Sequence, residues 1–126
     1  MSLFKKIKEK IPKIKIETHF SLLYGTYNSS KIDEGDGDLN IGKSARVTID
    51  ELIGHNISIS GHVKAKKIHA ERDIFILEDA VVEAEKIYAH NRLYIKKGAK
   101  VTADIESRYF SCDEAAKYNG THNTIE

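Results

Sequence analysis

Proline and cysteine occur once each in this sequence of 126 residues, tryptophan is absent, and the formal net charge is only +1. A single cysteine excludes an internal disulfide framework and is typical of a reducing cytoplasm. The nearly balanced charge gives no general affinity for nucleic acid or for other acidic partners. No run of residues is apolar enough to span a bilayer, and no secretory signal pattern is present. These absences predict a cytoplasmic protein.

What the sequence does contain is a repeat between residues 39 and 120. Each copy begins with two apolar residues two positions apart, the spacing that puts both side chains on one face of a β-strand. The first members of successive pairs stand at positions 39, 57, 74, 93 and 110, so the period is nearly constant. The five pairs are Leu39/Ile41, Ile57/Ile59, Ile74/Ile76, Leu93/Ile95 and Phe110/Cys112.

A second inward-facing position follows each pair. In four copies it comes six positions after the pair, and the shorter second copy places Val63 four positions on. Short runs separated by charged or glycine-containing corners predict a three-sided coil, and such coils must stack because none can bury its apolar side alone. The sequence therefore predicts an all-β protein, a single parallel β-helix of about five coils. The positions six after the pair are Val47, Val82, Val101 and Tyr118.

Charged residues at outward positions provide a check on the register of this stack. The predicted alignment places Lys64 beside Glu83, Lys66 beside Glu85, and Glu51 beside Lys67. Each such pair contributes only a few tenths of a kcal/mol, but a slip of one residue would separate all of them. Between residues 103 and 110 the fourth copy is shortened, which predicts an irregular corner.

The repeat divides the chain into four segments. Residues 39–121 are predicted to form the β-helix core, and residues 122–126 a frayed C-terminal tail. Residues 18–38 are predicted to be a capping segment: apolar residues alternate up to Tyr24, as in an incomplete first coil or a cap, and residues 25–38 form an acidic loop. Residues 1–17 differ in composition from the rest of the chain.

This N-terminal segment is predicted to be a flexible, basic, amphipathic tail. Residues 1–15 contain six lysines and one glutamate, and apolar residues recur at helical spacing before Pro12. So short a helix needs a surface to order it, and an anionic membrane would attract the lysines and accept the apolar side chains. A solvated terminus without a partner is the alternative; nucleic acid is disfavoured because no aromatic residues are interleaved. The predicted membrane-binding residues are Leu3, Phe4, Lys5, Lys6 and Ile7.

The sequence contains no recognisable catalytic, cofactor-binding or metal-binding set, so it predicts that the protein is not an enzyme. His55, His62 and His69 are evenly spaced, but the repeat places them at a corner and on different faces, so they do not converge on a metal. Cys112 falls on an inward position, which favours a small buried residue over a nucleophile. No phosphate-binding glycine loop or Ser/His/Asp arrangement is present.

The two ends of the stack are the remaining candidates for function. An end coil leaves strand edges and apolar side chains without a partner, and only six residues follow Gly120 to cover the C-terminal end. We therefore expect end-to-end association into a homopolymer. The predicted polymer interface comprises Leu39 and Ile41 of the first coil and Phe110, Cys112 and Tyr118 of the last.

The coil pattern, the segment CDEAAKYNG (112–120) and the opening MSLFKK resemble the bactofilins, bacterial polymer-forming cytoskeletal proteins. The resemblance covers residues 39–120 and the tail. It implies a right-handed β-helix and nucleotide-independent filaments, with polymer contacts made by the end coils. It also implies a peripheral location on the inner face of the cell membrane, through Met1, Leu3, Phe4 and Lys5, and scaffolding of cell-envelope proteins that set cell shape.

Two other functions are also compatible with the sequence. One is a left-handed β-helix like the hexapeptide-repeat acyltransferases or the γ-type carbonic anhydrases, which act as trimers. Its fixed six-residue step fits poorly with a period that varies from copy to copy, and its histidine trio or projecting loop is not evident. The other is a monomeric β-solenoid that binds a partner protein through its charged faces.

Overall fold

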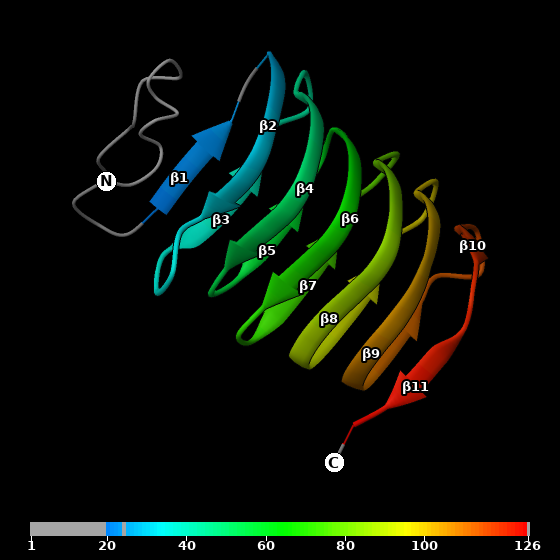
Figure 1. Cartoon of the computed structure of the whole chain (residues 1–126). Coiled ribbons are helices and arrows are strands. Elements are labelled where there is room, and N and C mark those ends of the chain that lie inside the picture. Colours follow the sequence, from blue (N-terminus) through cyan, green and yellow to red (C-terminus); the bar gives the residue numbers. More distant parts are fainter. Residues whose placement is uncertain (1–19, 24, 126) are drawn as a thin grey trace.

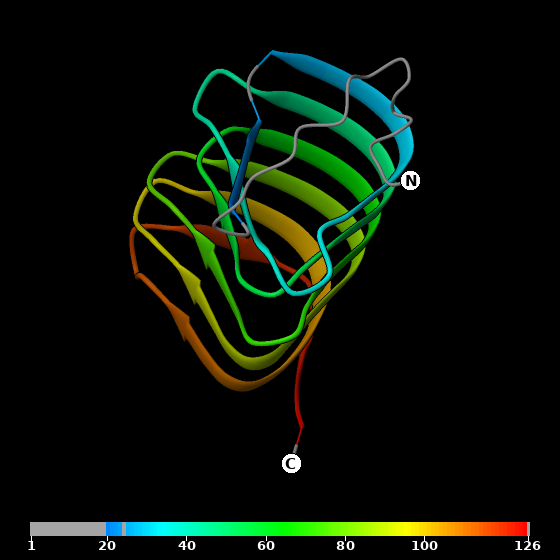
Figure 2. The ribbon, with the colours of Figure 1, turned by 90° about the vertical axis from the view of Figure 1, so that its left-hand side faces the viewer.

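The computed structural model describes residues 20–23 and 25–125, and these residues form eleven β-strands and no helix. Every strand pairing is parallel, and the chain winds into a β-solenoid (Figure 1). Seen from the N-terminal end in Figure 2, the chain turns clockwise as it recedes, so the β-helix is right-handed. The predicted all-β solenoid is confirmed. The predicted tail of residues 1–17 lies outside the described residues.

The solenoid has six coils, one more than the sequence predicts. Coil 1 contains β1 and β2, and each later coil adds one full turn. The strands are β1 (Phe20–Leu23), β2 (Thr26–Asp33), β3 (Asp38–Ile41), β4 (Arg46–Gly54), β5 (Ile57–Ile59), β6 (His62–Ala70), β7 (Asp73–Ile76), β8 (Val81–Ile95), β9 (Lys100–Cys112), β10 (Lys117–Asn119) and β11 (His122–Thr124). The long strands β8 and β9 each turn corners, so that each ends in the coil after the one in which it starts.

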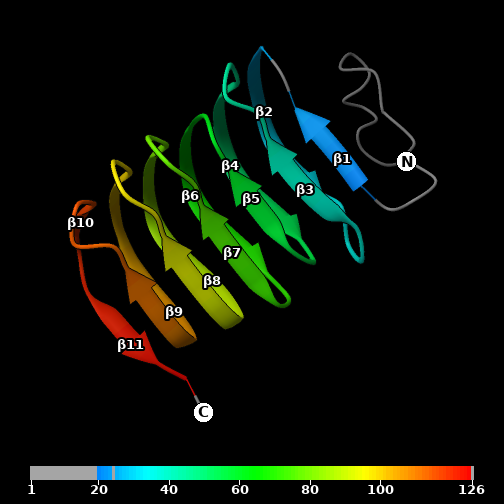
Figure 3. The ribbon, with the colours of Figure 1, turned by 180° about the vertical axis from the view of Figure 1, so that it is seen from behind.

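Each coil has three sides, which we name A, B and C in chain order. Side A is seen from outside in Figure 3 as a row of parallel arrows. Sides B and C are the two arms of one long strand that bends between them, as in β4 and β6. Side A contains β1, β3, β5, β7 and residues 92–95 and 109–112; side B contains residues 26–29, 46–49, 62–65, 81–84 and 100–102 and β10; side C contains residues 31–33, 51–54, 67–70, 86–89 and 104–107 and β11.

The core consists of inward residues stacked in columns, one from each coil. Ile57, Ile74 and Leu93 lie in register on side A and are all fully buried. Burial of each such side chain contributes roughly 1.5–3 kcal/mol relative to exposure. A second column runs along side C through fully buried residues of four coils. Its members are Leu52, Ile68, Ile87 and Ile105.

The additional coil corrects the predicted boundary at residue 39. Residues 26–33 are not a loop but strand β2, which pairs with β4, and β1 pairs with β3. Tyr27 lies in register with Val47, and the buried Ile32 with Leu52. The sequence hides this coil because most residues of β2 are polar. Only residues 34–37 separate β2 from β3.

The C-terminal tail predicted at residues 122–126 is also corrected. Strand β11 pairs with residues 105–107 of β9 and completes the third side of coil 6. The backbone ladder continues to Ile125, whose N–H donates to the Ser107 carbonyl oxygen at 3.0 Å. The last coil therefore has the same three sides as the coils before it.

The predicted register is confirmed at two of the three charged positions. Lys64 pairs with Glu83 and Glu51 with Lys67 on adjacent strands. The ion pairs that form run between other neighbours, including Lys31 with Glu51 at 3.6 Å and Lys86 with Glu106 at 3.0 Å. The irregular corner is also confirmed, because the pairing of β8 with β9 shifts register twice.

A ladder of alternating carboxylates and amides runs along the corner between sides C and A. The Asn56 amide donates to Asp38 Oδ1 at 3.0 Å, and the Asp73 N–H donates to Asn56 Oδ1 at 3.2 Å. The Asn91 amide donates to Asp73 Oδ1, also at 3.0 Å. Because the two kinds of side chain alternate, no two negative charges are adjacent along the ladder.

Gly61 explains how the second copy of the repeat can be shorter at the corner between sides A and B. A Cβ at this position would collide with the Gly42 carbonyl oxygen and lie 2.6 Å from that of Ala45. The corner of coil 3 can therefore pass this close to coil 2 only with glycine.

Candidate functional site: the C-terminal end of the solenoid

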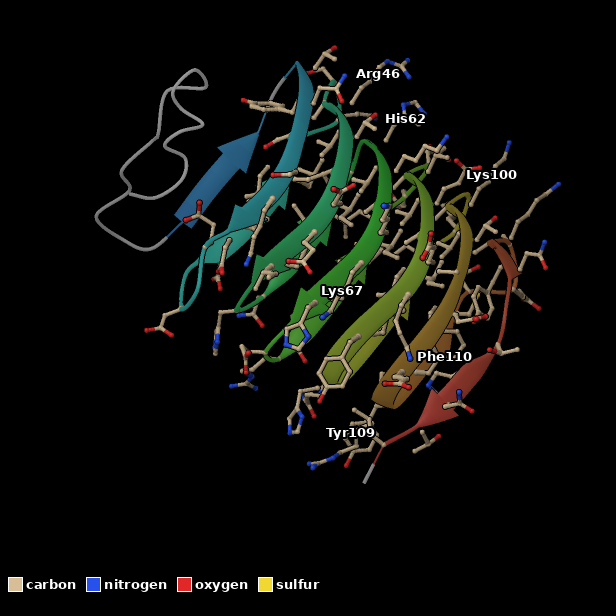
Figure 4. All side chains as sticks on the ribbon, viewed as in Figure 1. Arg46, His62, Lys67, Lys100, Tyr109 and Phe110 are labelled. Carbon is tan, nitrogen blue, oxygen red and sulfur yellow. The ribbon has the colours of Figure 1, made fainter. Side chains whose placement is uncertain are left out.

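The residues at the C-terminal end continue the core columns with a different chemistry. Phe110 is in register with Leu93, Tyr118 with Val101, and His122 with Ile105. One ring thus enters the centre of coil 6 from each of its three sides. Figure 4 shows Phe110 at this end of the stack, beside Tyr109. We call Phe110, Tyr118 and His122 the ring cluster.

The three rings of the cluster contact one another. The Phe110 and His122 rings stack, with centroids 4.4 Å apart and an angle of 20° between their planes. The Phe110 and Tyr118 rings are tilted by 53°, with centroids 5.4 Å apart. Tilted and offset aromatic pairs of this kind add about 0.5–1.5 kcal/mol beyond the area that they bury.

The Tyr118 hydroxyl and one ring nitrogen of His122 form hydrogen bonds within the protein. The Tyr118 hydroxyl is 2.6 Å from the Thr121 carbonyl oxygen and 3.3 Å from that of Ala103. A hydrogen bond of 2.9 Å joins His122 Nε2 to the hydroxyl of Ser107, which is fully buried. These bonds occupy the Tyr118 hydroxyl and one of the two His122 ring nitrogens, so the surface that the cluster offers at the end of the stack is mainly ring carbon.

Two ionisable groups at this end are held in their neutral forms. Burial raises the pKa of the Tyr118 hydroxyl, and the charge of Asp104, together with that of Cys112 when its thiol is ionised, raises it further. Burial likewise raises the pKa of the Cys112 thiol, with the Asp113 carboxylate adding to the effect. A thiol with a raised pKa is a poor nucleophile at neutral pH, because the thiolate is the reactive form.

The inward residues of coil 6 are more exposed than those of the coils behind them. Phe110, Cys112 and Tyr118 are half-buried, whereas Leu93, Ile95 and Val101 are at most 1% exposed. The strands of coil 6 are also paired on one side only, within the part of the chain that the structure describes. Apolar side chains and an unpaired backbone edge therefore coincide at this end.

The predicted interface residues at the other end lie elsewhere than expected. Leu39 and Ile41 are not at an end, because β1 pairs with β3 and covers them, and each is 1% exposed. They are core residues, and this part of the predicted interface is corrected. The inward residues of coil 1 that the structure describes on sides B and C are Tyr27 and Ser29, which are half-buried, and Ile32, which is buried.

The sequence identifies Phe110, Cys112 and Tyr118 correctly as residues of the terminal coil, but it misses His122. The step from Ile105 to His122 equals the step from Ile57 to Ile74, and this match with the repeat is the signal that could have revealed the histidine. A polar residue in an otherwise aliphatic column conceals the match.

The predicted membrane-binding residues Met1, Leu3, Phe4, Lys5, Lys6 and Ile7 lie outside the described residues. Within residues 20–23 and 25–125, no helix is long and apolar enough to cross a bilayer. The same residues contain no group of three His, Cys, Asp or Glu side chains placed to hold a metal ion.

Comparison with known proteins adds no family to this description: no family model, curated protein or solved structure matches the chain.

Proposed function

We propose that the protein is a bactofilin-like cytoskeletal element that polymerises end to end, without a nucleotide, into filaments. The observation that carries this proposal is the C-terminal end of the stack, where the half-buried ring cluster and an unpaired strand edge coincide. A second copy placed there would extend both the core columns and the backbone ladder. The function on this proposal is mechanical, and the protein scaffolds cell-envelope proteins.

The size of the contact favours association. Complete burial of a fully exposed large side chain contributes roughly 1.5–3 kcal/mol, of which the half-buried Phe110 would gain a part, and the backbone edge adds hydrogen bonds along three sides. Association also costs translational and rotational freedom, which opposes much of this gain. A rigid coil reduces the further cost, because its strands are already ordered before a second copy arrives.

The experiment is electron microscopy of the purified full chain and of two variants. Phe110→Arg places a charge within the ring cluster, so we expect dispersed particles in place of filaments. Asn123→Arg is the matched control, because Asn123 is exposed and lies on the same coil. This variant should form filaments like the parent chain, and circular dichroism should show that both variants are folded.

Two results would count against polymerisation. One is a parent chain that stays dispersed over the range of concentration and salt in which it is soluble. The other is a folded Phe110→Arg variant that forms filaments as readily as the parent, since the C-terminal end would then not be the contact.

We further propose that the filament lies on the inner face of the cell membrane, bound through the basic residues at the start of the chain. The six lysines of residues 1–15 support this proposal, since each gains about 1 kcal/mol near an anionic surface. Deleting residues 1–11 should release the protein from vesicles that contain phosphatidylglycerol, in a flotation assay. Equal flotation of the truncated and full chains would exclude this role for the segment.

A further inference from the structure

Side A differs from the other two sides in the residues that it turns outward. Its central outward row contains no charge and carries two aromatic residues in register, Phe75 on β7 and Tyr94 on β8. The corresponding rows on sides B and C include charged residues, such as Lys64, Glu83 and Glu106. Side A is thus the surface of the solenoid best suited to exclude water.

Two charged residues flank these rings and are also neighbours. Asp73 is in register with Arg92, and each lies two positions before the ring on its own strand. The hydrogen bonds to the Asp73 carboxylate both fall on Oδ1, one from the Asn91 amide and one from the Arg92 N–H. Within the described residues, Oδ2 of Asp73 and the guanidinium of Arg92 make no hydrogen bond or ion pair.

From this arrangement we infer that side A pairs with side A of a second copy about a two-fold axis. The axis runs parallel to the strands, between β7 and residues 92–95 of β8. A two-fold contact requires that each residue lie opposite its complement in the other copy. Here the axis places Asp73 opposite Arg92 and Phe75 opposite Tyr94, once in each direction. Both pairs are complementary, one by charge and one by ring contact.

The neighbouring coils also fit this pairing. The same axis brings Ser58 of coil 3 opposite Ser111 of coil 6, so small side chains meet on either side of the rings. Two sheets that face each other lie about 10 Å apart, a distance that Phe and Tyr can fill while serines leave room for water. Lys96 Nζ lies 5.6 Å from the centre of the Tyr94 ring, within cation–π distance.

The area of the side A contact indicates whether single molecules or only filaments pair stably. Four strands about 4.8 Å apart, each of about four residues, cover roughly 250 Å² on each copy. This is well below the roughly 800 Å² per partner of a stable protein–protein interface. A pair of single molecules should therefore dissociate readily, whereas two filaments repeat the contact along their length and gain by multivalency. The inference rests on the proposed polymer for its effect, but the contact itself does not require filaments.

The first test is the width of the filaments in electron micrographs. The parent chain should give paired filaments at low salt, and Arg92→Glu should give single filaments of similar length, because two like charges would then face each other. Lys67→Glu, which makes the same charge change on side C, should leave the filaments paired. At about 0.5 M NaCl the pairs should separate while the filaments persist, since salt screens the exposed charges more than the apolar end contact. Paired Arg92→Glu filaments would overturn the inference, as would single parent filaments at low salt.

A second test works even if no filament forms. In a Cys112→Ala background, Ser58→Cys and Ser111→Cys are prepared separately and mixed, and a bis-maleimide of about 10 Å span is added. The mixture should yield at least fivefold more cross-linked dimer than either variant alone, because the two-fold axis brings residue 58 of one copy opposite residue 111 of the other. Two copies of the same variant would hold their cysteines roughly 17 Å apart, since residues 58 and 111 are three strands apart on side A. Selective cross-linking without filaments would refute the proposed polymer and retain this pairing. Filaments without selective cross-linking would refute the pairing alone.

Discussion

The interior coils and the last coil occupy the same positions of the repeat with different residues. Inside the stack, the columns that lead to Phe110, Tyr118 and His122 contain aliphatic side chains that are buried between a coil above and a coil below. In coil 6, the same columns end in Phe110, Tyr118 and His122, which have a neighbouring coil on one side only, within the part of the chain that the structure describes. A repeat fixes where side chains lie, but a second neighbouring coil decides whether they are buried.

The largest expected effect comes from truncating one interior residue and one residue of the last coil in the same column. Leu93→Ala should lower the free energy of unfolding by about 2–5 kcal/mol, because the side chain is fully buried and its neighbours can only partly fill the cavity. Phe110→Ala should cost about 1–2 kcal/mol, because solvent already reaches the ring. Urea unfolding of dispersed protein measures both. An equal or larger loss for Phe110→Ala would show that coil 6 is as enclosed as the interior.

A smaller loss of stability is expected when one polar group of coil 6 is removed. Tyr118→Phe keeps the ring and removes the hydroxyl that bonds to two carbonyl oxygens, so we expect a loss of about 1 kcal/mol. Hydrogen exchange should be faster in β10 and β11 and unchanged in β5 to β7. Faster exchange throughout the stack would contradict the independence of the last coil.

The same variant has a consequence at alkaline pH. The pKa of Tyr118 is raised in the folded state, chiefly by burial. The folded state therefore favours the neutral hydroxyl, and this stabilisation is complete below the ordinary pKa of about 10 and is lost as the pH rises through the folded-state value. The parent chain should lose protection of β10 and β11 above that pH, and Tyr118→Phe should lose less.

The sequence predicts the part of the fold in which the apolar repeat matches the buried positions of the structure. The spacing of residues such as Ile57 and Ile74 predicts the strands and inward faces of coils 2 to 5 and of the first two sides of coil 6, but not the third side of coil 6. It fails at coil 1, because β2 is polar except at Tyr27 and Ile32. There the pairing with β4 fixes the strand, and no local pattern contains that information.

The repeat also limits how far the contact surfaces of the solenoid could be predicted from the sequence. Phe110, Cys112 and Tyr118 could be assigned to the last coil because the repeat ends with them. Leu39 and Ile41 could not be assigned correctly, because a coil that the pattern does not reveal covers them. The complementarity of Asp73 with Arg92 on side A becomes visible only once the strand register is known, since the two belong to successive coils and are far apart in sequence.

The ladder of Asp38, Asn56, Asp73 and Asn91 constrains how a chain of this kind can change its length in evolution. Duplication of the coil that contains Asp38 or Asp73 would bring two carboxylates together at this corner, where they repel and neither can donate a hydrogen bond to the other. Duplication of the coil that contains Asn56 or Asn91 keeps the ladder bonded, because one amide can donate to the carbonyl oxygen of the next. Duplication of two coils preserves the alternation. We therefore expect versions of this solenoid that gain a single coil in this region to gain one whose ladder residue is an amide, and the others to differ by even numbers of coils.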